Sequence, residues 1–157
     1  MDVSRQRLAF LLETVQLEAE HLKATDGRLF SVPFTTERAA TLRDDDVLAE
    51  RLDAFVARFA RLQDTAGDKL LPALLTRIGE PVGAVLDNLD RAARLGWLDV
   101  ASEDWLAVRL LRNRMVHEYI RQPEMLAEAV NAAHAAVPML LHFVERCGAY
   151  VRARQLV

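Results

Sequence analysis

The feature that most constrains the fold of this chain is a seam of large apolar residues in its first half. The seam consists of Leu48, Leu52, Phe55, Phe59 and Leu62, which follow one another at steps of four, three, four and three residues. Because an α-helix has about 3.6 residues per turn, such steps keep returning to one side of it. The seam therefore predicts a long amphipathic helix whose apolar side belongs to a core.

Similar spacing elsewhere predicts that the rest of the chain is helical too. The expected helices run from about Ser4 to Ala24, from Thr35 or Thr36 to about Arg43, from Val47 towards Ile78, from Val82 to Leu95, from Glu103 to about Ile120 and from Pro123 towards Leu156. With 157 residues, 52% of them hydrophobic and 27% charged, the chain fits one compact domain. We therefore expect a single all-α domain, an up-and-down bundle of about five to six helices.

The residues between these segments are typical of helix ends. Thr25-Asp26-Gly27 is expected to end the first helix, and Gly96 to end the helix that precedes it, because glycine readily takes the positive φ found just after a helix. Ser102 is expected to cap the helix that follows it. The apolar residues expected to bury that helix are Trp105, Leu106, Val108, Leu110, Leu111 and Met115. Gly67 and Pro72 interrupt the long third segment, and proline has no backbone N–H to donate. We expect a kink or a break there, with Pro72 in the first turn of a new segment.

Three groups of residues invite a ligand, and for each a structural role is the expectation. Phe30 and Phe34 lie in a loop and are expected to anchor it in the core, with stacking on a nucleobase as the alternative. The acidic run Asp44–Asp46 is expected to complement the dipole of the next helix, with metal binding as the alternative. His134 and His142 are eight residues apart and do not share the spacing that binds one metal from a helix.

The net charge and the number of cysteines indicate how the protein can bind nucleic acid and in which compartment it works. The net charge of −3 argues against a protein that coats nucleic acid electrostatically, so any contact with RNA must be local. Cys147 is the single cysteine, which rules out an internal disulfide and favours a reducing cytoplasm. The first residues lead into an amphipathic run, and this run resembles neither a signal peptide nor a membrane span. We expect a cytoplasmic protein that does not bind membranes.

One segment combines residue types that a packed helix does not need. The run Arg112-Asn113-Arg114-Met115-Val116-His117-Glu118-Tyr119 gathers two guanidiniums, an amide, an imidazole and a phenol within about two helical turns. Arginine binds phosphate, histidine transfers protons near neutral pH, and tyrosine offers a hydroxyl for modification. On an ideal helix Asn113 and His117 share a face. The mixture indicates chemistry on a phosphorylated polymer.

The spacing of Arg112, His117 and Tyr119 resembles the Arg-x4-His-x-Tyr signature of the HepT family, within the HEPN superfamily of all-helical ribonucleases. The resemblance covers this one helix and includes the polar Asn113 after the first arginine. It implies an HEPN-like bundle and a metal-independent endoribonuclease, the toxin of a toxin-antitoxin module. It also implies a homodimer in which two motifs form one site, and an MntA-type nucleotidyltransferase antitoxin that silences the toxin by transferring AMP to the motif tyrosine.

Carried over to this chain, the resemblance makes Arg112 and His117 catalytic and Tyr119 the AMPylated residue. His117 would move the proton of the attacking 2′-hydroxyl or of the departing 5′-oxygen. Arg112 would neutralise the charge on the phosphorane, and Asn113 would orient the phosphate or the imidazole. No metal or other cofactor is expected. Since one motif supplies only one imidazole, we expect the helix Glu103–Ile120 to lie at a two-fold interface.

Alternatives remain open for the same residues. Arg109 and Arg114 are candidates for binding RNA phosphate, while a salt-bridging role for Arg109 is an equal alternative. A purely structural interpretation makes Arg112 and Glu118 surface ion-pair residues and His117 a packed histidine. A functional alternative makes the chain a non-catalytic partner or substrate-binding module for a minimal nucleotidyltransferase.

Overall fold

A computed structural model of the protein describes residues 2–117 and 121–157, and of His117 it describes the backbone. Its elements are α1 (Val3–Leu29), α2 (Thr36–Ala40), the 3-10 turn η1 (Leu42–Asp44), α3 (Asp46–Asp64), the π-helix η2 (Thr65–Leu70), α4 (Leu71–Arg77), α5 (Val85–Arg94), α6 (Ser102–His117) and α7 (Pro123–Ala153). The segments α3, η2 and α4 follow one another without a gap and count as one helix. The described residues therefore form six helices and no strand, which confirms the predicted all-α bundle.

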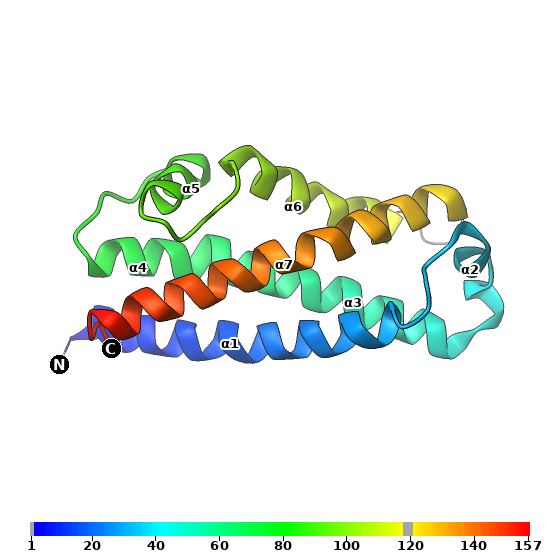
Figure 1. Ribbon diagram of the computed structural model, residues 1–157, viewed down its shortest axis with the longest axis horizontal. Coiled ribbons are helices and arrows are strands. Elements are labelled where there is room, and N and C mark those ends of the chain that lie inside the picture. The colour runs from blue at the N-terminus through cyan, green and yellow to red at the C-terminus, as the bar shows by residue number, and fades with distance from the viewer. Residues whose placement is uncertain (1, 118–120) are drawn as a thin grey trace.

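Four long helical segments run alongside one another and alternate in direction (Figure 1). Helix α1 runs away from the N-terminus, the α3–η2–α4 rod returns, α6 runs outward again, and α7 brings the C-terminus back beside the N-terminus. Helix α1 packs against α3 and α7, and α6 packs against α7 and α3. The short α2 closes one end, while α5 packs against α4 and α6. This is the up-and-down order expected from the sequence.

The predicted seam lies in the core. All five of its members are buried, and Phe55 and Phe59 are fully so. Phe34 is buried and Phe30 packs at the edge of the core, with its ring in edge contact with that of Phe55 at 5.4 Å. The two loop phenylalanines therefore act as the predicted anchors. Their burial fixes the connection between α1 and α2.

Side-chain caps begin α1, α2 and α3, and a glycine follows the end of two other helices. Asp2 accepts hydrogen bonds from the N–H groups of Ser4 and Arg5 at the start of α1, and Asp45 accepts one from Leu48 at the start of α3. Thr35 caps α2 in the same way. After α4 and α5, Gly79 and Gly96 take φ values of 78° and 82°, which L-residues rarely adopt. Thr35 thus caps α2 and Gly96 follows the end of α5, as the sequence predicted.

The first predicted helix end was wrong. Helix α1 continues through Gly27 to Leu29, and the N–H of Phe30 still donates to the carbonyl oxygen of Asp26 at 3.0 Å. Leu29 is fully buried. Burying a leucine contributes about 1.5–3 kcal/mol, which outweighs the cost of about 1 kcal/mol for a glycine inside a helix.

Four further boundaries differ from those predicted. Helix α2 ends at Ala40, short of about Arg43, and the 3-10 turn η1 follows it. Helix α5 begins at Val85 instead of Val82, because the side-chain amide of Asn88 bonds to both the N–H and the carbonyl of Gly83 and holds that residue outside the helix. Ser102 is itself the first residue of α6, and its hydroxyl donates to Asp90 at 2.6 Å instead of capping the helix. Helix α7 ends at Ala153, short of Leu156.

No break occurs at Gly67 and Pro72. Pro72 lies in the first turn of α4, as predicted, but the chain reaches it through the π-helix η2 without leaving the helical path. A π-helix bonds each N–H to the carbonyl five residues earlier, so it changes the bonding pattern just where a proline removes a donor. The rod from Asp46 to Arg77 therefore stays continuous and carries its side chains past α6.

Among the described residues, none of the helices combines the length and apolar character needed to cross a membrane.

Candidate functional site

Helix α6, which carries the polar segment, is attached to the bundle by one side. Trp105 and Met115 are fully buried, and the side-chain amide of Gln63 on α3 donates to the carbonyl oxygen of Trp105 at 3.2 Å. The opposite side remains open to solvent. Leu110, which was predicted to be buried, is 62% exposed, and Val116 is 56% exposed. The prediction for Leu110 was wrong because the bundle covers a narrower side of α6 than its apolar content indicates.

The π-helix brings α6 unusually close to the rod. Gly67 in η2 faces the indole of Trp105, and a Cβ at position 67 would lie 2.9 Å from its Nε1 atom. Only glycine leaves room for this approach. Because Arg109 follows Trp105 by one helical turn and Asp68 follows Gly67 directly, the contact also sets how near these two charged residues lie.

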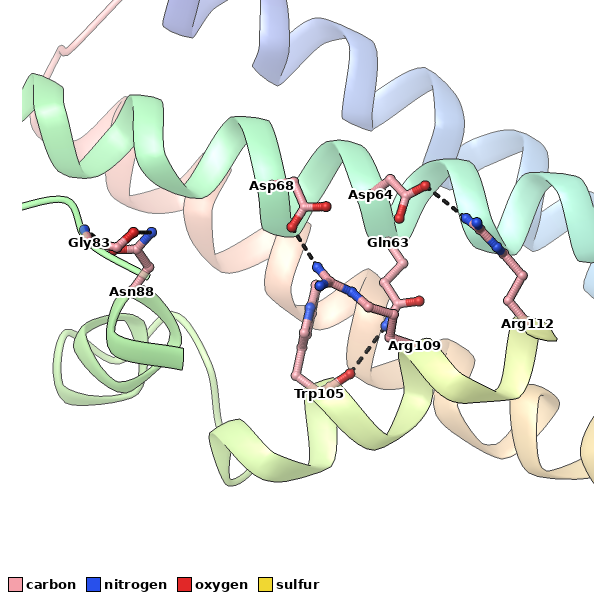
Figure 2. A network of polar contacts seen from close by, with 8 residues as sticks. All are labelled: Gln63, Asp64, Asp68, Gly83, Asn88, Trp105, Arg109 and Arg112. Carbon is pink, nitrogen blue, oxygen red and sulfur yellow. Dashed lines mark hydrogen bonds and ion pairs between the residues drawn. The ribbon is translucent and has the colours of Figure 1, made fainter. Parts of the chain in front are cut away.

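Two ion pairs connect α6 to the rod, and Figure 2 shows the guanidiniums of both arginines reaching across to carboxylates of α3 and η2. Arg112 Nη1 lies 3.0 Å from Asp64 Oδ2, and Arg109 Nη2 lies 2.5 Å from Asp68 Oδ1. Asp64 and Asp68 are one turn apart on the rod, while Arg109 and Arg112 are one turn apart on the antiparallel α6. We call these two pairs the ion-pair ladder.

The ladder borders a surface cavity of about 440 Å³. Its lining consists of three cationic side chains, two carboxylates and one amide: Lys69, Arg109, Arg112, Asp64, Asp68 and Asn113. The cations exceed the carboxylates, and guanidinium groups are suited to binding phosphate oxygens. The structure thus brings together Arg109, Arg112 and Asn113 of the predicted site. The cavity can accept an anion if the arginines exchange partners.

The remaining predicted residues do not share this cavity or are not described. Arg114 points to α7, where its Nη2 atom lies 3.9 Å from Glu128 Oε2, so it is separate from Arg109 and Arg112. His117 is the last described residue of α6, and its side chain lies outside the described residues. Tyr119 lies outside them as well.

Sequence reasoning missed Asp64, Asp68 and Lys69. The apolar seam dominates the pattern of this stretch and gives no role to its polar residues. A usable signal was present: two acids four residues apart on one helix match two arginines three residues apart on another, when the helices are antiparallel. The ion-pair alternative considered for Arg109 is the arrangement found here, and Arg112 also pairs, with Asp64 as its partner.

The other candidate ligands have structural contacts. His134 stacks on Phe30 with ring centroids 3.8 Å apart, and its Nδ1 atom lies 2.7 Å from Asp26 Oδ1. The Nδ1 atom of His142 lies 3.8 Å from Asp99 Oδ2. Among the described residues, no group of three or more His, Cys, Asp or Glu side chains is placed to bind a metal ion. Burial raises the pKa of the Cys147 thiol, which makes this cysteine a poor nucleophile.

Comparison of the chain with protein-family models, with curated proteins and with solved structures finds no match. The comparisons identify no family for the chain. Its structural class, an all-helical bundle of about six helices, comes from the structure itself.

Proposed function

We propose that the protein is a metal-independent endoribonuclease of the HepT type, with Arg112, Asn113 and His117 as its catalytic residues. The observation that carries the proposal is the placement of Arg112 and Asn113 on an exposed part of α6, beside the cavity that also receives Arg109 and Lys69. Arg112 and Asn113 precede His117 by less than two turns on the same helix. A phosphodiester bound to Arg112 would therefore lie near the histidine position of the motif.

The proposed reaction is internal transphosphorylation of RNA. The 2′-oxygen attacks the adjacent phosphorus and gives up its proton to a base, while the bond to the 5′-oxygen breaks and that oxygen takes a proton from an acid. His117 supplies one of these transfers, and His117 of a second copy supplies the other. Arg112 neutralises the charge that builds on the phosphorane, and Asn113 orients the phosphate. The products are a 2′,3′-cyclic phosphate and a 5′-hydroxyl.

Cleavage of a labelled RNA in the presence of EDTA tests the proposal. The parent protein should cleave the RNA, and Arg112→Ala and His117→Ala should each abolish cleavage. Arg146→Ala is a matched control, because Arg146 is as exposed as Arg112 and its Nη2 atom also forms an ion pair, 3.3 Å from Asp99 Oδ2, but neither residue lines the cavity. If His117→Ala cleaves as fast as the parent, the assignment is wrong.

The proposed active form is a homodimer with α6 at its two-fold face. The exposure of Leu110 and Val116 supports this, because a second copy would cover these apolar side chains. Adding an excess of His117→Ala to the parent protein should lower cleavage per parent chain, since a mixed dimer keeps only one of the two histidines that the reaction uses. A monomer in sedimentation experiments, or cleavage that added His117→Ala leaves unchanged, would contradict the composite site.

The proposal includes a protein partner and one modified residue. A minimal nucleotidyltransferase of the MntA type would transfer AMP to Tyr119. In that step the phenol oxygen attacks the α-phosphorus of a nucleoside triphosphate, the phenol loses its proton, and pyrophosphate leaves. The added phosphate would place a negative charge two residues from His117 and repel RNA. Mass spectrometry of the chain coexpressed with such an enzyme should find the added AMP on Tyr119, and Tyr119→Phe should prevent it.

A second candidate function is favoured by the ion-pair ladder. Both Arg109 and Arg112 already have carboxylate partners within their own chain, as residues of a non-catalytic module would. In that case the chain would serve as a partner or substrate-binding module for a nucleotidyltransferase. Expression in cells separates the two candidates. Growth arrest that Arg112→Ala or His117→Ala relieves supports the nuclease, while arrest unaffected by either change excludes these residues as its cause.

A further inference from the structure

We propose that Asp64 and Asp68 set the affinity of the candidate site for RNA, because they occupy the guanidiniums that RNA phosphates must take over. The inference rests on the proposed function in one respect, the identity of the ligand as RNA. It assigns a role to two residues of α3 and η2 that lie outside the motif of α6. The expected sign is specific: removing either carboxylate should strengthen RNA binding.

The geometry of the ladder carries this inference. Each carboxylate contacts one terminal nitrogen of its arginine, Asp64 to Arg112 and Asp68 to Arg109, at the distances given above. Both carboxylates and both guanidiniums line the same cavity (Figure 2). A phosphate that enters this cavity therefore meets arginines that are already paired and carboxylates that repel it.

The exposure of the ladder makes an exchange of partners feasible. The side chains of Arg112 and Asp64 are 44% and 45% exposed, so water screens their attraction. Exposed ion pairs of this kind contribute little to stability. The two ion pairs can therefore open at a small cost in free energy. After they open, each carboxylate still lies within a few ångströms of the bound phosphate and weakens its binding by repulsion. Competition for the guanidinium and direct repulsion act in the same direction.

The competing role for Asp64 has the opposite sign. If Asp64 positioned Arg112 for catalysis, its loss would leave the guanidinium mobile and would weaken binding or slow cleavage. Positioning requires a rigid pair, and the ladder has its four side chains between 36% and 45% exposed. The excess of cations over carboxylates in the cavity also favours competition, since neutralising Asp64 or Asp68 further raises the positive potential there.

The test measures binding of a 2′-O-methylated oligoribonucleotide, which keeps the phosphates but lacks the attacking hydroxyl and is not cleaved. Asp64→Asn and Asp68→Asn retain the size of the side chain and remove the charge. Each should lower the Kd by about two- to fivefold, the range that corresponds to an exposed ion pair. Asp53→Asn is the control, because Asp53 is exposed on the same helix α3 but lies outside the cavity. Its Kd should stay close to that of the parent at physiological salt, where charges are screened over about 8 Å.

A double-mutant cycle identifies the arginine involved. In an Arg112→Ala background, Asp64→Asn should tighten binding by less than it does in the parent, since the guanidinium for which carboxylate and phosphate compete is absent and only direct repulsion remains. A Kd that Asp64→Asn leaves unchanged or raises would overturn the inference, as would an equal gain from Asp53→Asn.

Cleavage of unmodified RNA distinguishes this inference from the proposed function. Tighter binding by Asp64→Asn together with no cleavage by the parent protein would leave the inference standing and remove the nuclease. Cleavage by the parent without tighter binding by Asp64→Asn would support the nuclease and overturn the inference. Absence of RNA binding by all of the proteins would overturn the inference.

Discussion

The backbone of Gly67 packs directly against the indole of Trp105, at the place where the π-helix η2 lies beside α6. The backbone of Gly67 lies so close to the indole that an added Cβ would be 2.9 Å from Nε1 and 3.2 Å from Cζ2. Trp105 is fully buried, with its ring also 4.9 Å from that of Phe143 on α7. The indole has core on both sides and cannot move away freely. This contact therefore determines the separation of α6 from the rod, and with it the geometry of the ion-pair ladder.

The first prediction concerns Gly67→Ala. Alanine favours a helix over glycine by about 1 kcal/mol, but overpacking a fixed core costs about 1–3 kcal/mol. We expect Gly67→Ala to lower the free energy of unfolding measured in urea. Gly27→Ala in α1 is the control, because a Cβ there meets nothing within 4 Å and its φ is not positive. That variant should be more stable than the parent by about 0.4–1 kcal/mol. Equal stabilisation by both changes would show that the Trp105 side chain moves to make room for the added methyl group.

The second prediction concerns Glu18, whose Oε1 atom accepts a hydrogen bond from Thr65 at 3.2 Å. Burial raises the pKa of the Glu18 carboxyl above its ordinary value of 4.5. Between 4.5 and the raised pKa the folded state binds more protons than the unfolded state, so stability falls as the pH rises through this window. Glu18→Gln removes that loss.

Urea unfolding at two pH values checks the second prediction. Glu18→Gln should be more stable than the parent at pH 7, and the difference should shrink at pH 4, where the parent carboxyl is mostly protonated in both states. Glu13→Gln, an exposed change on the same helix, should leave the pH dependence as it is in the parent. A Glu18→Gln variant that is less stable than the parent at pH 7 would contradict the sign.

The third prediction concerns the start of α3. Asp45 accepts a hydrogen bond from the N–H of Leu48 at 3.0 Å, which satisfies a helix-terminal donor. Asp45→Ala should lower the free energy of unfolding by about 1 kcal/mol. Asp44→Ala, in the preceding turn η1, should change it by less than about 0.5 kcal/mol. Similar losses from both would indicate that the acidic run acts through its total charge and not through one cap.

The fourth prediction separates stability from activity at Arg112. Because Arg112 and Asp64 form an exposed pair, Arg112→Ala should change the free energy of unfolding by no more than about 1 kcal/mol. Loss of RNA cleavage in this variant would then reflect the missing guanidinium and not unfolding. Circular dichroism during thermal unfolding checks this directly. A cooperative transition displaced by tens of degrees would contradict it.

Helix existence and core membership could be predicted here because both follow from local periodicity. The seam from Leu48 to Leu62 is buried as expected, and so are the two loop phenylalanines. Errors occurred where one particular contact overrides a general helix preference. Burial of Leu29 carries α1 past Gly27, and the side chain of Asn88 delays the start of α5. Leu110 is exposed because the described part of the chain packs on the other side of α6, where Trp105 and Met115 are buried.

For the candidate site, the sequence by itself determined which side chains α6 carries and in what order, since helical geometry places Arg109, Arg112 and Asn113 within about a turn of one another. Only the tertiary structure decided what those side chains face. Asp64 and Arg112 are separated by 48 positions along the chain, and they meet because the π-helix and Gly67 let α6 approach the rod. Periodicity records which face of a helix is apolar, but the partner of a charged group depends on the helix that packs beside it.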